Sequence, residues 1–154
     1  MADNVNEKDM LISVDDGARR VPVMNGLGEE IGSFTFRPTD VGIIERYNRL
    51  ADSFAEITRP LEALGEADGE EQKLAALKEA QRRLFAAVNA LFEGDVAGAF
   101  FGGMNPFSPV NGAFYCELAL RAVGAFIDRQ FETETAKLTG RARRYAARAG
   151  RHGG

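Results

Sequence analysis

The side chains that most often carry out catalysis are few in this sequence and lie far apart. The one cysteine, Cys116, falls in an apolar helical pattern with no basic neighbour, which favours a buried thiol over a nucleophile. The one histidine, His152, lies beside the last glycines, and no serine stands in a GxSxG elbow. One Cys and one His also leave little material for a transition-metal site. We therefore expect no catalytic residue, no metal and no cofactor.

Glycines and carboxylates give no better candidate site. Gly26–Gly28 and Gly102–Gly103 lack both the Lys-Ser/Thr pair of a P-loop and the GxGxxG spacing of a dinucleotide site. Asp15–Gly17 lacks the later ligands of a calcium loop and indicates a turn. Glu45 and Glu56 lie on an amphipathic pattern that favours a solvated face over a catalytic pair. The sequence predicts a protein that is not an enzyme.

The stretch Phe100–Phe114, FFGGMNPFSPVNGAF, suits packing or binding instead. It contains four Phe, three Gly and two Pro between two helical patterns. The prolines and glycines cannot continue a helix, and four Phe side chains would be costly to leave in water. We expect an ordered, buried crossing loop. For residues 104–114, a packing lid and a binding surface both stay open.

The charge of the chain is divided unevenly. The formal net charge is −4, but six Lys or Arg and no acid follow from Lys137 onward. The rest of the chain keeps 13 of the 19 basic groups against all 23 acidic groups, a net charge of −10. On a helix, Arg141, Arg144 and Arg148 would share one side, with Tyr145 beside them. We expect this basic face either to contact a partner protein or to stay in solvent. Nucleic-acid binding is a third possibility, but the acidic body and the lack of a recognisable nucleic-acid-binding motif count against it.

Before the stretch Phe100–Phe114, the sequence pattern changes from one typical of strands to one typical of helices. Three β-prone runs, Leu11–Val14, Val21–Met24 and Ile31–Phe36, alternate with turn signals and predict a meander of two or three antiparallel strands. Thr39 or Asp40 is the expected N-cap of a first helix, which Pro60 should end.

Two long helices follow in the pattern. One is expected from about Glu70 to Phe92, with Gly94 as its C-cap and a short helical turn after it. The last is expected to start at Asn111 or Gly112 and to run toward Arg148, with its end frayed. The broad apolar face of the last helix predicts burial between elements or a partner surface.

The predicted fold class is α+β. Residues 1–9 are expected to be disordered, and residues 10–136 to form one domain, with a β-meander at 10–37 and a body of three to four helices at 38–136. Residues 137–154 are expected to form a basic tail. No apolar run reaches the roughly 18–20 residues of a membrane span, and the polar start is not a signal peptide. A single cysteine then favours a reducing cytosol.

The segment Leu91–Gly103, LFEGDVAGAFFGG, is similar to a motif of the type F-(D/E)-x-x-F-G-E-G-x-x-x-x-(I/F)-F-G-G. An Asn-containing loop, a last helix and a Lys/Arg/Tyr end, GRARRYAAR (Gly140–Arg148), follow it. This order resembles small tail assembly proteins of long-tailed bacteriophages. The layout matches over about Phe36 to Arg148, and the motif itself over Phe92–Gly103. The insertion PFSPVNGAF departs from the pattern, so no loop function is transferred.

The resemblance implies a chaperone-like protein of the host cytoplasm. It would bind apolar segments of the tape-measure protein and help the tail tube assemble. No binding residue is carried over from the family. Our own candidates are the loop residues and tail residues Phe100, Phe101, Met104, Phe107, Arg141, Arg144, Tyr145 and Arg148. Two alternatives stay open: a tail-tube or connector subunit that forms homo-oligomers, and a nucleic-acid-binding regulator.

Overall fold

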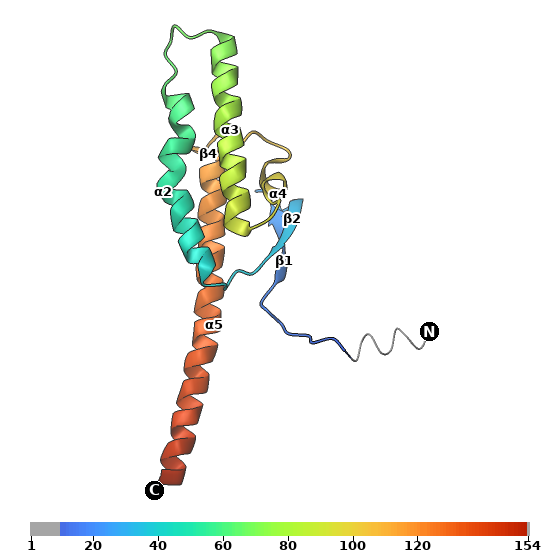
Figure 1. The fold of residues 1–154 in the computed structure, drawn as a ribbon, viewed down its shortest axis with the longest axis vertical. Helices are drawn as coiled ribbons and strands as arrows, with labels where there is room; N and C mark the ends of the chain where they lie inside the picture. Colours follow the sequence, from blue (N-terminus) through green and yellow to red (C-terminus); the bar gives the residue numbers. More distant parts are fainter. Residues whose placement is uncertain (1–9, 154) are drawn as a thin grey trace, which may run out of the picture.

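The protein is an α+β fold, as predicted, with a β-hairpin beside a mainly helical body (Figure 1). The computed structural model describes residues 10–153, and for residues 142 and 145–153 it describes the backbone alone. The expected disorder of residues 1–9 lies outside this part. The elements in chain order are β1 (Arg19–Met24), β2 (Glu30–Phe36), α2 (Gly42–Glu62), α3 (Glu70–Phe92), α4 (Ala97–Phe101), β3 (Pro109–Val110), β4 (Ala113–Phe114) and α5 (Tyr115–Gly153).

Strands β1 and β2 form an antiparallel hairpin in which Val21 pairs with Phe34. The Asn25 Oδ1 atom closes the turn by accepting hydrogen bonds from the N–H groups of Leu27 and Glu29, both at 2.9 Å. The predicted β-prone run Leu11–Val14 is not a strand in the structure. Among the described residues, the strands pair only as β1 with β2 and β3 with β4, so no strand there offers this run a partner.

The hairpin is stabilised by close packing on α4. A two-stranded hairpin is marginal on its own in water. At Gly32 of β2, an added Cβ atom would lie 2.5 Å from the carbonyl oxygen of Ala99 in α4. Phe34 then places its ring centroid 4.8 Å from that of Phe92 at the end of α3. The hairpin is therefore attached to the helices by backbone contact and by aromatic rings.

Helix α2 continues through Pro60, so the prediction that Pro60 ends it is wrong. Proline has no N–H to donate to the carbonyl four residues earlier, which is that of Glu56. In the structure this carbonyl accepts a hydrogen bond from Arg83 Nη1 of α3, at 3.1 Å. A long-range donor thus replaces the missing helical one. At the other end, the N-cap residue is Val41 and not Thr39 or Asp40, although Asp40 Oδ1 accepts a hydrogen bond from the Gly42 N–H at 3.1 Å.

Helix α3 begins at Glu70 and ends at Phe92, as predicted. The left-handed residue after it is Glu93, with φ 55°, and not Gly94. Arg46 of α2 holds this end in place: its Nε atom donates to the Leu91 carbonyl at 2.8 Å, and its guanidinium lies 3.1 Å from Glu93. The arginine thus satisfies one of the carbonyls that a helix end leaves without a partner.

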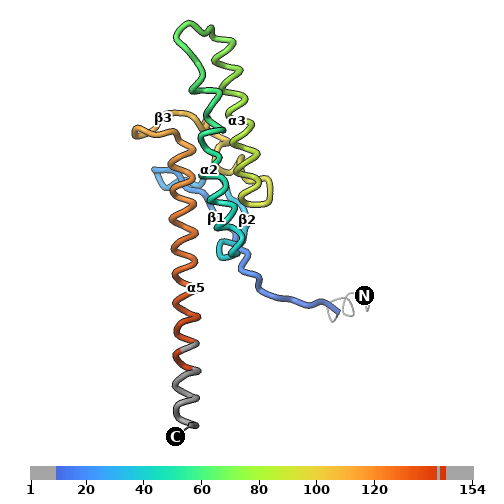
Figure 2. The backbone as a smooth tube through the Cα atoms, turned by 60° about the vertical axis from the view of Figure 1, so that its left-hand side comes forward, coloured from blue at the N-terminus to red at the C-terminus, as the bar shows by residue number. Residues whose placement is uncertain are grey.

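Helix α5 starts later than predicted, at Tyr115. Asn111 and Gly112 both have positive φ, 51° and 80°, and form the turn of the β3–β4 hairpin. Asn-Gly is the pair that favours such a two-residue turn. The backbone of α5 then continues to Gly153. Its first half packs against α2 and the hairpin, and its second half projects past the body (Figures 1 and 2).

The core lies where α2, α3, α4 and the first half of α5 meet the hairpin. Its most deeply buried side chains are Ile43, Ala80, Leu84, Val88, Leu91 and Cys116. The buried hydrophobic side chains of the described residues form one cluster, which includes Phe100, Phe101 and Phe107 of the loop region.

Candidate functional site

The predicted loop residues lie mostly in the core. Phe100, Phe101 and Phe107 are only 7–8% exposed, whereas Met104 is 37% exposed. Side chains as buried as these three pack the fold and offer a partner almost no surface. Of the four loop candidates, Met104 alone has an accessible side chain.

Phe100 and Phe101 connect the two sides of the core. The Phe100 ring lies 5.3 Å from Phe34 of β2, centroid to centroid. Phe101 lies 5.7 Å from Phe85 of α3 and 5.8 Å from Tyr115 of α5. Ring pairs at such distances stabilise beyond the area that they bury. The segment that carries the family resemblance is thus a packing centre of this protein.

The loop after α4 is fixed by backbone hydrogen bonds to α5. The Cys116 N–H donates to the Pro106 carbonyl, and the Tyr115 N–H donates to the Ser108 carbonyl, each at 2.8 Å. The Tyr115 hydroxyl donates to the Phe100 carbonyl at 3.0 Å. These bonds also supply acceptors for the first N–H groups of α5. Within residues 104–114, Pro106 and Phe107 are buried, whereas Met104, Pro109, Asn111 and Gly112 are exposed, so a packing lid and a binding surface both stay open for this stretch.

The basic residues of the tail lie on the projecting part of α5. Arg141 and Arg144 are exposed, and the side chains of Tyr145 and Arg148 fall outside the described part. The loop candidates and the tail candidates lie at opposite ends of α5 (Figure 1). They do not form one site.

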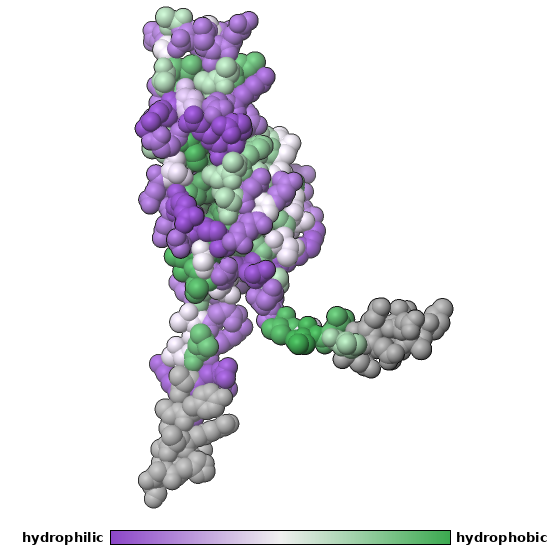
Figure 3. Space-filling model, in the orientation of Figure 1, coloured by the Kyte–Doolittle hydropathy of each residue, from purple (hydrophilic) through white to green (hydrophobic). Residues whose placement is uncertain are grey.

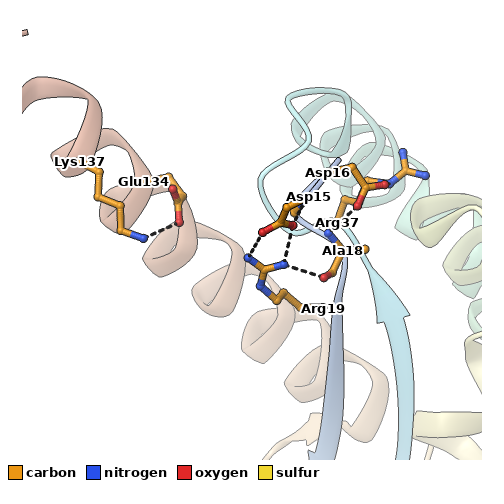
Figure 4. A network of polar contacts seen from close by, with 8 residues as sticks. Asp15, Asp16, Ala18, Arg19, Arg37, Glu134 and Lys137 are labelled. Atoms are coloured by element: carbon orange, nitrogen blue, oxygen red, sulfur yellow. Dashed lines mark hydrogen bonds and ion pairs between the residues drawn. The ribbon is translucent and has the colours of Figure 1, made fainter. Parts of the chain in front are cut away.

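The sequence reading missed an exposed apolar arm, residues 10–14. Met10, Leu11, Ile12 and Val14 are 72–93% exposed, and the arm extends away from the body (Figure 3). Its base is held by ion pairs between Asp15 and Arg19, at 3.1 Å, and between Asp16 and Arg37, at 3.0 Å (Figure 4). Exposed apolar groups gathered in this way mark an interaction site more often than single ones do. The run was visible in the sequence, but its exposure depends on the absence of a neighbouring strand.

A shallow groove between α2 and α5 is the second apolar surface. Two adjoining hollows, of about 220 Å³ and about 460 Å³, share Tyr47 and Arg121 in their walls. The Tyr47 hydroxyl donates to the Leu120 carbonyl at 3.0 Å, and a Cβ atom at Gly124 would lie only 2.7 Å from that hydroxyl. Burial, and to a lesser extent Asp128, raise the pKa of Tyr47. Tyr47 therefore stays neutral and fixes the spacing of the two helices.

Cys116 is confirmed as a buried cysteine, with no exposed surface. Burial, with a smaller contribution from Glu117, raises the pKa of its thiol to about 12.

In the described part of the chain, no group of three or more His, Cys, Asp or Glu side chains is placed to hold a metal ion. Within residues 10–153, no helix has both the length and the apolar character needed to cross a membrane.

Cys116 is expected to resist thiol reagents in the folded protein. Because its pKa is raised from 9.0 to about 12, the contribution of the thiol to stability is fully present below pH 9 and is lost as the pH rises toward 12. At about pH 8.5, labelling by a disulfide reagent should be far slower in the folded protein than in denaturant. Equal labelling rates in the two states would show that Cys116 is accessible.

The described part of the chain thus presents two candidate surfaces, the exposed arm and the α2–α5 groove. Comparison of the chain with protein-family models, curated proteins and solved structures finds no match.

Proposed function

We propose that this protein is a chaperone-like, non-enzymatic assembly protein of a long-tailed bacteriophage, acting in the host cytoplasm. It would bind apolar segments of the tape-measure protein and aid assembly of the tail tube. The observation that carries the proposal is the exposed apolar arm, residues 10–14, on a body whose described aromatic residues belong to or pack against the core. The resemblance of Leu91–Gly103 to tail assembly proteins supplies the kind of partner.

The arm suits an apolar partner segment for a physical reason. In an extended segment, alternate side chains point to the same side, so Met10, Ile12 and Val14 would form one apolar row. Methionine also adapts to irregular apolar surfaces, because its side chain is unbranched and flexible. Covering these side chains with a partner removes apolar surface from water, which drives binding.

Co-expression with the tape-measure protein encoded beside it should yield a soluble complex. The double variant Leu11→Asp, Ile12→Asp places charge in the arm and should lower recovery of the complex by at least about tenfold, as expected for central apolar contacts. Both residues are exposed, so the variant should unfold at the same denaturant concentration as the wild type. Recovery is measured by affinity capture and the stability by urea unfolding.

The matched control is Leu27→Asp, because Leu27 is 84% exposed and lies in the β1–β2 turn, away from the arm. It should leave recovery of the complex unchanged. The proposal fails if the tape-measure protein stays insoluble with the wild-type chain. If the Leu27 variant loses as much complex as the arm variant, the arm is not the binding segment.

A further inference from the structure

The second half of α5 projects past the body beyond Glu134, which still borders residues 15–19. Helix α5 has 39 residues, which corresponds to about 58 Å at 1.5 Å per residue. Every residue from Glu132 to Thr139 is exposed, and Leu138 keeps 64% of its surface in water. In proteins, most helical stability comes from packing of an amphipathic face, and this segment leaves its apolar residues in water. Figure 3 shows apolar surface on this otherwise polar projecting part.

The sequence of this segment repeats every seven residues. Large residues recur at Phe131, Leu138 and Tyr145, and a smaller residue follows each of them four positions later, at Thr135, Ala142 and Ala149. The alternate spacing of four and three residues is that of a coiled-coil seam. The seam continues from Phe131, which packs against the core, into the part that projects beyond it. Large side chains on one helix can thus fit against small ones on another.

Charge along the segment sets the orientation of a second helix. Residues 128–134 contain Asp128, Glu132 and Glu134 with one arginine, whereas residues 137–151 contain six basic residues and no acid. Glu134 and Lys137 form an exposed ion pair at 3.1 Å, which adds little stability (Figure 4). A parallel pair would place the basic parts side by side. An antiparallel pair places the basic part of one helix along the acidic part of the other.

We propose that the segment 131–149 pairs antiparallel with the same segment of a second copy, forming a two-fold symmetric dimer. Leu138 lies near the symmetry axis and packs against the small residues of the other helix. The same patch serves on both copies, so the contact closes on itself and does not grow into a filament. The two bodies, with their arms and grooves, then lie at opposite ends of the helix pair. This dimer does not depend on the proposed tape-measure partner.

The proposal is tested by measuring the molar mass of the full chain. The protein is treated with nuclease, separated by size-exclusion chromatography and analysed by light scattering. The wild type should shift from monomer to dimer as its concentration rises from about 1 to about 500 µM, since dimerisation follows mass action. Leu138→Glu should lower the association constant of the dimer by roughly thirtyfold, as expected for the loss of a central apolar contact. The matched control is Leu74→Glu, because Leu74 is an exposed leucine on α3, with 53% of its surface in water. It should leave the dimer intact.

Cross-linking with a short bis-maleimide tests the orientation. In an antiparallel pair centred near Leu138, Leu138→Cys variants should cross-link, whereas Ala149→Cys variants should not, because their backbones lie roughly 25 Å or more apart. The parent chain is the control, since its Cys116 is buried. Cross-linking at both positions would show a parallel pair. A wild type that stays monomeric, or a Leu138→Glu variant that dimerises as well as the wild type, would overturn the proposal.

Discussion

Replacing Phe101 by alanine is expected to lower the free energy of unfolding by about 4 kcal/mol, within the range for large core aromatic residues. The Phe101 side chain is 7% exposed, and its ring contacts Phe85, Phe100 and Tyr115. These contacts join α3, α4 and α5, so no single element can move to fill the cavity. Urea unfolding followed by circular dichroism would measure the change.

The control in the same segment is Met104→Ala. Met104 is 37% exposed, so its truncation should change the free energy of unfolding by no more than about 1 kcal/mol. The pair of variants separates the two roles that the sequence left open for this stretch. If Phe101→Ala keeps the wild-type stability but loses partner binding, Phe101 is a contact residue and not a packing centre.

The helical body was largely predictable because its signals are local. The 3.6-residue spacing of apolar residues and the acids at the first turn placed α3 between Glu70 and Phe92. Pro60 misled the prediction because proline is a local signal too, and its effect here is compensated from a distance. The Arg83 guanidinium that bonds the Glu56 carbonyl belongs to another helix, 27 positions further along the chain. No pattern within α2 could reveal this donor.

The Asn111-Gly112 pair shows how one signal can support two interpretations. Asn is common at helix N-caps and also in two-residue hairpin turns. The structure has the turn, because the backbone on either side pairs as β3 and β4. The loop was expected to be buried on aromatic content alone, and its three buried Phe rings follow that expectation. Which of its residues stay accessible depended on the surrounding elements.

The exposed surfaces were harder to predict than the core. The arm at residues 10–14 and Leu138 are apolar, and apolar residues are expected inside a fold. Their exposure follows from elements that end too early to cover them: within residues 10–153 no strand pairs with the arm, and the body ends before Leu138. Such absences are properties of the whole arrangement of elements. For this reason the sequence located a candidate region at Phe100–Phe114 in which the structure buries Phe100, Phe101, Pro106 and Phe107 in the core.

Gly32→Ala is expected to be nearly as damaging as Phe101→Ala, although it adds a single methyl group. The added Cβ atom would lie 2.5 Å from the Ala99 carbonyl oxygen and 2.8 Å from the Ala99 Cα atom. Both are backbone atoms, so no side-chain rotation can relieve the contact. Helix α4 or strand β2 has to shift, and a shift of β2 would disturb Phe34 and Phe36, which stack on each other and both contact the Phe92 ring at the end of α3. We expect a loss of about 3 kcal/mol in the free energy of unfolding, at the upper end for overpacking.

The comparison with Gly26→Ala makes this expectation specific to the contact. Gly26 lies in the turn of the same hairpin, and a Cβ atom there would meet nothing within 4 Å. Its replacement should therefore change the free energy of unfolding by less than about 0.5 kcal/mol, as for other surface changes. If both variants unfold at the same urea concentration, the hairpin does not rest on α4 as closely as the Gly32–Ala99 contact requires. If Gly32→Ala alone is destabilised, the contact between β2 and α4 holds the hairpin to the helical body.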